Sequence, residues 1–169
     1  MNSFVESGMT FGPFKDETVF LIEKSRMMRA CTGVMTVEFI WHRKKNVLCF
    51  VEAKSSSPIN RRGNEEEYET FLEEISTKFS HSIDLFLAGL LERRAGHQEI
   101  HTSIKNANYK QIQFKFILIL KGHEKEDLLK GLEKDLEDRL TALRSMWGGQ
   151  LLVLNEQMAK ELHFISSAT

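Results

Sequence analysis

Two acidic residues and a lysine near the middle of the chain have the spacing of a candidate cation site. Glu52 and Lys54 end the segment Val47 to Lys54, and in a strand residues two positions apart share a face. In a hairpin centred near Lys45, Glu38 would lie roughly opposite Glu52, where two carboxylates can share a cation. Because Glu52 and Lys54 stand at a strand end, we expect their tips to lie near solvent.

Three segments rich in β-branched and aromatic residues predict the strands that position these side chains. They are Thr18 to Glu23, Val34 to Trp41 and Val47 to Lys54. The polar run 42–46 between the second and third has the length of a hairpin loop, so we predict that these two strands are antiparallel. Residues 55–64 collect Ser, Pro, Asn and Gly, and therefore predict a loop after Lys54.

The second half of the chain predicts helices alternating with two more strands. Apolar residues at three- and four-residue steps predict an amphipathic helix over Glu65 to Arg94. Ile112 to Leu120 becomes continuously apolar, which is typical of a strand buried on both faces inside a sheet. The remaining predicted elements are a helix over Glu124 to Trp147, a strand over Leu151 to Leu154 and a helix over Glu156 to Phe164.

The predicted fold class is α/β, with the order β-β-β-α-β-α-β-α. It would form a mixed sheet with N-terminal antiparallel strands, flanked by helices. With 169 residues, the chain has the length of one domain, and we expect residues 1–169 to form a single unit.

These features resemble the PD-(D/E)XK nuclease superfamily, whose fold is restriction-endonuclease-like. In that family, an acidic residue on one strand and Glu-x-Lys or Asp-x-Lys on the next bind a divalent metal, and the following helix packs over the sheet. Val51-Glu52-Ala53-Lys54 matches the second half of this pattern, and Glu38 stands for the first acid. The resemblance covers Val19 to Leu120 and rests on the order of the elements more than on identity.

The resemblance implies a metal-dependent nuclease that hydrolyses the phosphodiester bonds of DNA, in DNA processing or in defence against foreign DNA. Glu38 and Glu52 would bind Mg²⁺ or Mn²⁺, because hard cations prefer oxygen ligands. Lys54 would be the catalytic lysine, which polarises the attacking water and stabilises the charge of the transition state. Glu23 would be a third or outer acid, and Lys78 would contact a phosphate.

Other interpretations of the same residues stay open. Glu52 and Lys54 also fit an ordinary strand end or a weak ion pair. The chain also fits a non-catalytic domain that binds a protein partner or a second copy through its sheet edge or its long helix. The formal charge of -1 favours this alternative, as does Val37-Glu38 in place of the family's Pro-Asp.

Charge and cysteine content indicate which partners and which cellular location to expect. With a net charge of -1, nucleic acid would have to meet a local basic patch, and the runs 42–45 and 61–62 are either such patches or solvated loops. Cys31 and Cys49 lack Cys-x-x-Cys spacing, which favours reduced thiols and a cytoplasmic location. No apolar run has the length of a membrane span or the pattern of a signal peptide, so we expect no membrane contact.

Overall fold

A five-stranded mixed sheet forms the centre of the protein, and a separate two-stranded sheet packs near it. The structure is a computed structural model and describes residues 1–122 and 126–166. The small antiparallel sheet contains β1 (Asn2–Glu6) and β2 (Met9–Phe14). The large sheet has the order β3-β4-β5-β6-β7, formed by Val19–Phe20, Phe39–Lys44, Val47–Lys54, Gln113–Leu120 and Gln150–Asn155.

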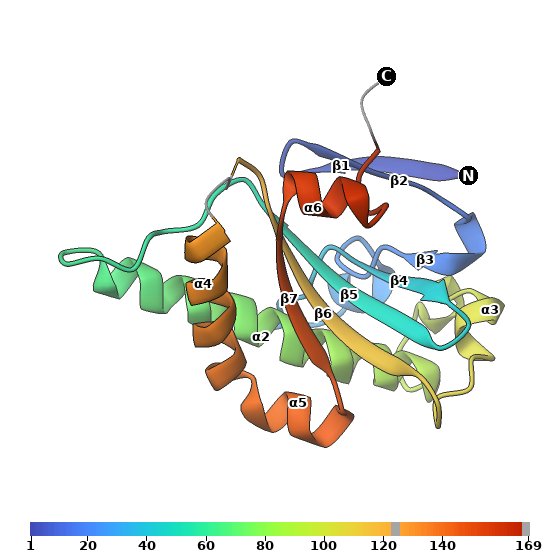
Figure 1. The fold of residues 1–169 in the computed structure, drawn as a ribbon. Helices are drawn as coiled ribbons and strands as arrows, with labels where there is room; N and C mark the ends of the chain where they lie inside the picture. The colour runs from blue at the N-terminus through green and yellow to red at the C-terminus, as the bar shows by residue number, and fades with distance from the viewer. Residues whose placement is uncertain (123–125, 167–169) are drawn as a thin grey trace.

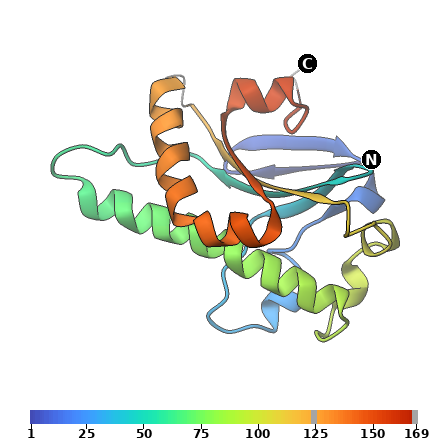
Figure 2. The same cartoon turned by 60° about the horizontal axis from the view of Figure 1, so that its bottom comes forward.

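Helices cover both faces of the large sheet. The α-helices are α1 (Arg26–Arg29), α2 (Glu65–Leu90), α3 (Thr102–Lys105), α4 (Glu126–Arg139), α5 (Thr141–Trp147) and α6 (Glu156–Glu161), and short 3-10 turns span Asp16–Thr18 and His97–Glu99. Helices α2, α4 and α5 lie against one face, while α6 and the β1–β2 hairpin lie against the other (Figure 1). Figure 2 shows α2 running along the sheet with α4 crossing it. No helix of the described residues is long and apolar enough to cross a membrane.

Strand β5 is buried on both faces, and its successive side chains point alternately into the two hydrophobic cores. Leu48 and Phe50 belong to the core under α2, whereas Cys49 and Val51 belong to the core under the hairpin and α6. β5 pairs antiparallel with β4 and parallel with β6. The same alternation places Glu52 on the α2 face, at the end of the strand.

Helix α2 is the longest element, and its apolar stripe lies on the large sheet. Its first turn contains Glu65, Glu66 and Glu67, whose charges favour the N-terminal end of a helix. Phe79 on this stripe is completely buried and meets Phe116 of β6 edge to face, with ring centroids 5.4 Å apart. Helix α2 passes over the end of β5, where Lys78 contacts Glu52.

The structure confirms the mixed α/β architecture and the antiparallel pair formed by β4 and β5. It also confirms an interior position for β6, which lies between β5 and β7. Helix α2 ends at Leu90 rather than Arg94, and α6 ends at Glu161 rather than Phe164. The loop between β4 and β5 is shorter than expected, because His42, Arg43 and Lys44 belong to β4.

Two predicted strands are shorter than expected, because their backbone groups bond elsewhere. Strand β4 begins at Phe39 rather than Val34. The N–H groups of Met35 and Val37 donate to His81 and Ser82 of α2 instead of to a neighbouring strand. Strand β3 ends at Phe20 rather than Glu23, since the chain turns there and the N–H of Ile22 donates to the carbonyl of Phe20.

The prediction of one helix up to Trp147 is wrong, since α4 ends at Arg139 and α5 begins at Thr141. The expected start of that helix at Glu124 lies outside the described residues. The Thr141 hydroxyl donates to the carbonyls of Glu137 and Asp138, a local bond that competes with regular helix geometry. After the bend, Trp147 packs against Phe114 of β6, with ring centroids 5.5 Å apart.

The β1–β2 hairpin and the short helices α1 and α3 are absent from the predicted order of elements. The hairpin turns at Ser7 and Gly8, which have φ of 49° and 72°. Its apolar residues pack on the large sheet rather than forming an independent unit: Phe11 meets Phe39 with ring centroids 5.2 Å apart. Phe11 also forms a β-bridge with Ile165, so the hairpin and the segment after α6 meet on this face.

We expect Phe79→Ala to lower the free energy of unfolding by roughly 2 to 5 kcal/mol, because it empties a completely buried site between α2 and β6. Urea melts at neutral pH measure the change. Glu73→Ala is the matched control, since Glu73 is exposed on the same helix. A loss below about 1 kcal/mol for Phe79→Ala would contradict the packing of α2 on the sheet.

Candidate functional site

Glu52 is completely buried and forms an ion pair with a lysine of α2. Its side chain has 0% exposure, and Lys78 Nζ donates to Glu52 Oε1 at 2.7 Å. Lys54 Nζ lies 3.6 Å from the same oxygen. The expectation that the tip of Glu52 reaches solvent is therefore wrong, because α2 covers the end of β5. Lys78 meets this carboxylate directly.

Lys54 is partly exposed and lies between two carboxylates. Its side chain has 25% exposure, and its Nζ donates to Glu74 Oε1 at 2.5 Å. Glu74 lies one turn before Lys78 on α2, so the two glutamate–lysine pairs lie side by side between the helix and β5. The Glu-x-Lys pair of the strand is thus matched by a Glu-x-x-x-Lys pair on the helix.

Glu38 lies in the bend immediately before β4, across from Glu52. The register pairs Phe39 with Val51 and Ile40 with Phe50, and one further step brings Glu38 opposite Glu52. This agrees with the position expected from the hairpin. The side chain of Glu38, however, gathers with a different set of acids.

Glu6, Glu23 and Glu38 form a cluster in which one carboxylate oxygen of each residue lies within 4.8 Å of the others. All three side chains are half-buried. Glu52 does not belong to this set, although its charge acts on both Glu38 and Glu23. Lys24 Nζ donates to Glu6 at the same place. The structure therefore places Glu23, an auxiliary candidate, beside Glu38 and places Lys78, the other auxiliary candidate, against Glu52.

Glu6 comes from the small sheet and was not found by sequence analysis. The hairpin tip is held at the ends of β5 and β6, because Ser7 Oγ donates to the carbonyl of Ala53 and Lys121 Nζ donates to the carbonyl of Gly8. These bonds bring Glu6 to the acidic cluster. The only local signal was a Glu immediately before a Ser-Gly turn, and that signal does not indicate where the turn docks.

Burial and neighbouring negative charge raise the pKa values of two of these carboxyls. Burial raises the pKa of Glu38 to about 8, with contributions from a hydrogen bond to Glu23 and from the charges of Glu52, Glu23 and Glu6. Burial also raises the pKa of Glu52 to about 6, opposed by the positive charges of Lys78 and Lys54. At neutral pH Glu52 is therefore mainly ionised, while Glu38 keeps a proton.

Two buried carboxylate oxygens lack a hydrogen-bond donor within residues 1–122 and 126–166. They are Oε2 of Glu38 and Oε2 of Glu52. A buried oxygen without a donor is costly, and a proton or a cation can remove that cost. The donor set of carboxylate oxygens fits a hard divalent cation such as Mg²⁺ or Mn²⁺.

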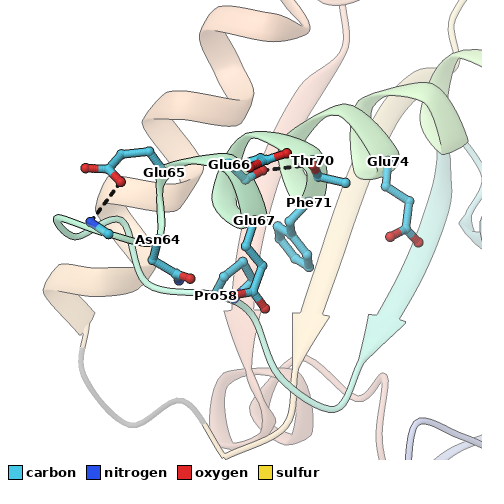
Figure 3. Close-up of a pocket in the computed structure, with 9 residues that line it drawn as sticks. Pro58, Asn64, Glu65, Glu66, Glu67, Thr70, Phe71 and Glu74 are labelled. Carbon is cyan, nitrogen blue, oxygen red and sulfur yellow. Dashed lines mark hydrogen bonds between the residues drawn. The ribbon is translucent and has the colours of Figure 1, made fainter.

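A cavity between α2 and the loop that follows Lys54 adjoins this site through Glu74. It has a volume of about 720 Å³ and lies between the 55–64 loop and the start of α2. In Figure 3, Glu67, Phe71 and Glu74 project from α2 on the side of the loop and the strands. Glu65 and Glu66 also line this cavity. Its acidic lining would repel a phosphate, so the cavity does not extend the site towards a nucleic acid.

The basic runs found in the sequence lie at different ends of the large sheet. His42, Arg43 and Lys44 end β4, and Lys45 lies in the turn that leads into β5, so this run is roughly 20 Å from Glu52 along the strand. The run 61–62 is exposed in the loop after Lys54. Only the second run lies in the loop that follows the candidate site.

Comparison with known proteins gives no match. No family model fits the chain, and no curated protein or solved structure matches it significantly.

We expect Lys78→Met to destabilise the protein by roughly 3 to 5 kcal/mol, because it leaves the buried carboxylate of Glu52 without its closest cation. Urea melts at neutral pH measure the loss. The double variant Lys78→Met with Glu52→Gln should recover much of it, since the uncompensated charge is then gone. Equal stability of Lys78→Met and wild type would show that this ion pair does not stabilise the fold.

The pKa of Glu38 is raised from its ordinary value of 4.5 to about 8 in the folded protein. The free energy of unfolding should therefore fall as the pH rises between these two values. In this range the native carboxyl keeps a proton that the unfolded chain has released, so raising the pH favours unfolding. Above about 8 both states are ionised and the effect is complete.

Urea melts in EDTA across this range test the expectation, with Glu38→Gln as the comparison. Between about 6 and about 8 the wild type should lose stability while Glu38→Gln changes much less, because Glu52 has already ionised there. Parallel profiles for the two proteins would contradict the raised pKa of Glu38.

Proposed function

We propose that this protein is a metal-dependent nuclease that hydrolyses phosphodiester bonds, with DNA as its substrate. Glu38 and Glu52 are the proposed ligands of Mg²⁺ or Mn²⁺, and Lys54 is the proposed catalytic lysine. The proposal includes a restriction-endonuclease-like arrangement of the sheet and a role in DNA processing or in defence against foreign DNA.

One observation carries the proposal: within residues 1–122 and 126–166, two buried carboxylate oxygens without donors lie at the bend before β4 and at the end of β5, beside a partly exposed lysine. They are Oε2 of Glu38 and Oε2 of Glu52, and Lys54 Nζ lies 3.6 Å from the other oxygen of Glu52. Burying a carboxylate without a donor is expensive, which favours a site kept for a ligand over an ordinary strand end. The accessible lysine supplies a positive charge at the edge of the site.

The proposed roles follow from the position and charge of each side chain. A divalent cation, when bound, lowers the pKa of a water and offsets phosphate charge. Lys54 lies at the exposed edge, where its ammonium stabilises the charge that develops on the phosphate. The water oxygen bonds to phosphorus and loses its proton to solvent, while one ester P–O bond breaks and the leaving oxygen takes a proton. Lys78 holds Glu52 in place.

Several features of the chain support the finer parts of the proposal. Three strands, β3, β4 and β5, are followed by α2 and then β6, as expected from the resemblance, with the short helices α1 and α3 inserted. A cytoplasmic location is supported by Cys31 and Cys49, which are both free thiols.

A second candidate function is a non-catalytic domain that binds a protein partner or a second copy. It is favoured by the pairing of both lysines of the site, since Lys54 contacts Glu74 and Lys78 contacts Glu52. In this reading the charges stabilise the contact of α2 with β5 and have no further role. A cleavage assay separates the two candidates.

Glu52→Gln should abolish DNA cleavage that depends on Mg²⁺ or Mn²⁺, because it removes a ligand charge while preserving the shape of the side chain. Lys54→Ala should lower the cleavage rate by roughly a hundredfold or more while metal affinity stays equal or rises slightly. Plasmid DNA, single-stranded DNA and RNA are the substrates, and calorimetry measures metal binding. Lys110→Ala is the matched control, since Lys110 is exposed in the turn before β6 and lies outside the site and the basic runs.

Thermal melts of each variant show whether lost activity reflects lost folding. Absence of cleavage by the wild type on all three substrates would overturn the nuclease proposal, whether or not the protein binds metal. The partner-binding domain would then be the better account. Cleavage that survives Glu52→Gln unchanged would overturn the assignment of the site.

A further inference from the structure

We propose that Glu6, Glu23 and Glu38 form a divalent-cation site that joins the β1–β2 hairpin to the large sheet. The ammonium of Lys24 competes with the cation for these carboxylates. This site extends the proposed nuclease centre through the shared residue Glu38, and to that extent it rests on the proposed function. Its new elements are Glu6, from a separate sheet, and the ammonium of Lys24.

The geometry of the cluster fits a single small cation. One oxygen from each of the three carboxylates lies within 4.8 Å of the others, and a hard cation that contacts each oxygen at about 2.0 to 2.6 Å spans such a triangle. The three residues come from the end of β1, the turn after β3 and the bend before β4. The side chains are half-buried, so a cation can enter from solvent.

The completely buried Glu52 is an independent observation that points to a ligand. Its side chain has 0% exposure, and its Oε2 finds no donor among the residues that the structure describes. One step beyond the pair formed by Phe39 and Val51, the register brings Glu52 opposite Glu38, one of the three acids of the cluster. A bound cation would compensate this fourth carboxylate, which Lys78 and Lys54 contact only through the other oxygen.

Lys24 already supplies a positive charge at this place. Its Nζ donates to Glu6, and the charges of Glu38 and Glu23 also act on it. Its side chain has 54% exposure, so the ammonium can move into solvent when a cation enters. This is the arrangement expected of a lysine that holds the acids together in the absence of the ion and competes with it.

Calorimetric titration of the full chain with Mn²⁺ tests the inference through two changes of opposite sign. Glu6→Gln should weaken Mn²⁺ binding roughly tenfold or more, because it replaces one of the three charged carboxylate ligands with a neutral amide. Lys24→Met should tighten Mn²⁺ binding by roughly two- to tenfold, because it removes the competing ammonium. Structural damage alone would not produce the second shift.

Two exposed residues of the same region provide matched controls. Glu17→Gln and Lys15→Met make the same chemical changes outside the cluster, and both should bind Mn²⁺ like the wild type. Thermal melts without metal show whether each variant is folded. Both predicted shifts are required, and the absence of either one overturns the inference.

The same titrations separate this inference from the nuclease proposal. If the wild type binds Mn²⁺ and Glu52→Gln weakens binding while Glu6→Gln does not, the inference fails and the nuclease proposal stands. If both shifts appear but nucleic acid is not cleaved, the cation site stands and the nuclease proposal fails. If the wild type binds no Mn²⁺, both fail.

Discussion

The buried carboxylate of Glu52 constrains the structure around it. A fully desolvated carboxylate costs several kcal/mol unless a cation accompanies it, and Lys78 Nζ meets it at 2.7 Å. This pairing requires α2 to pass directly over the end of β5 with its Lys78 side facing the sheet. The apolar stripe of α2, which includes Phe79, packs on the same face, so core packing and the ion pair fix the helix in one register.

The charges at this end of the sheet do not balance. Five carboxylates meet four lysines there: Glu6, Glu23, Glu38, Glu52 and Glu74 against Lys24, Lys54, Lys78 and Lys121. Full ionisation would therefore leave an excess of negative charge at this end of the sheet. Without a cation, the raised pKa of Glu38 relieves part of this excess, because the carboxyl keeps its proton. In the proposed cation site, a proton on Glu38 and a bound cation would compete for the same place.

The acidic centre also depends on how a separate sheet docks. Glu6 reaches it only because the hairpin tip bonds to the ends of β5 and β6 through Ser7 and Lys121. The hairpin in turn is held by its aromatic core, in which Phe11 meets Phe39. Assembly of the centre is thus linked to the packing of the face opposite α2.

The sequence alone determined the strand character of β4 and β5, their antiparallel pairing, the long helix α2 and the interior position of β6. Each follows from local periodicity, which also placed Glu52 and Lys54 on one face and Glu38 across from them. Tertiary structure decided the rest. The burial of Glu52, its contact with Lys78 and the arrival of Glu6 depend on residues distant in sequence. The late start of β4 arises because Met35 and Val37 bond to α2, and a pattern within one segment carries no information about such partners.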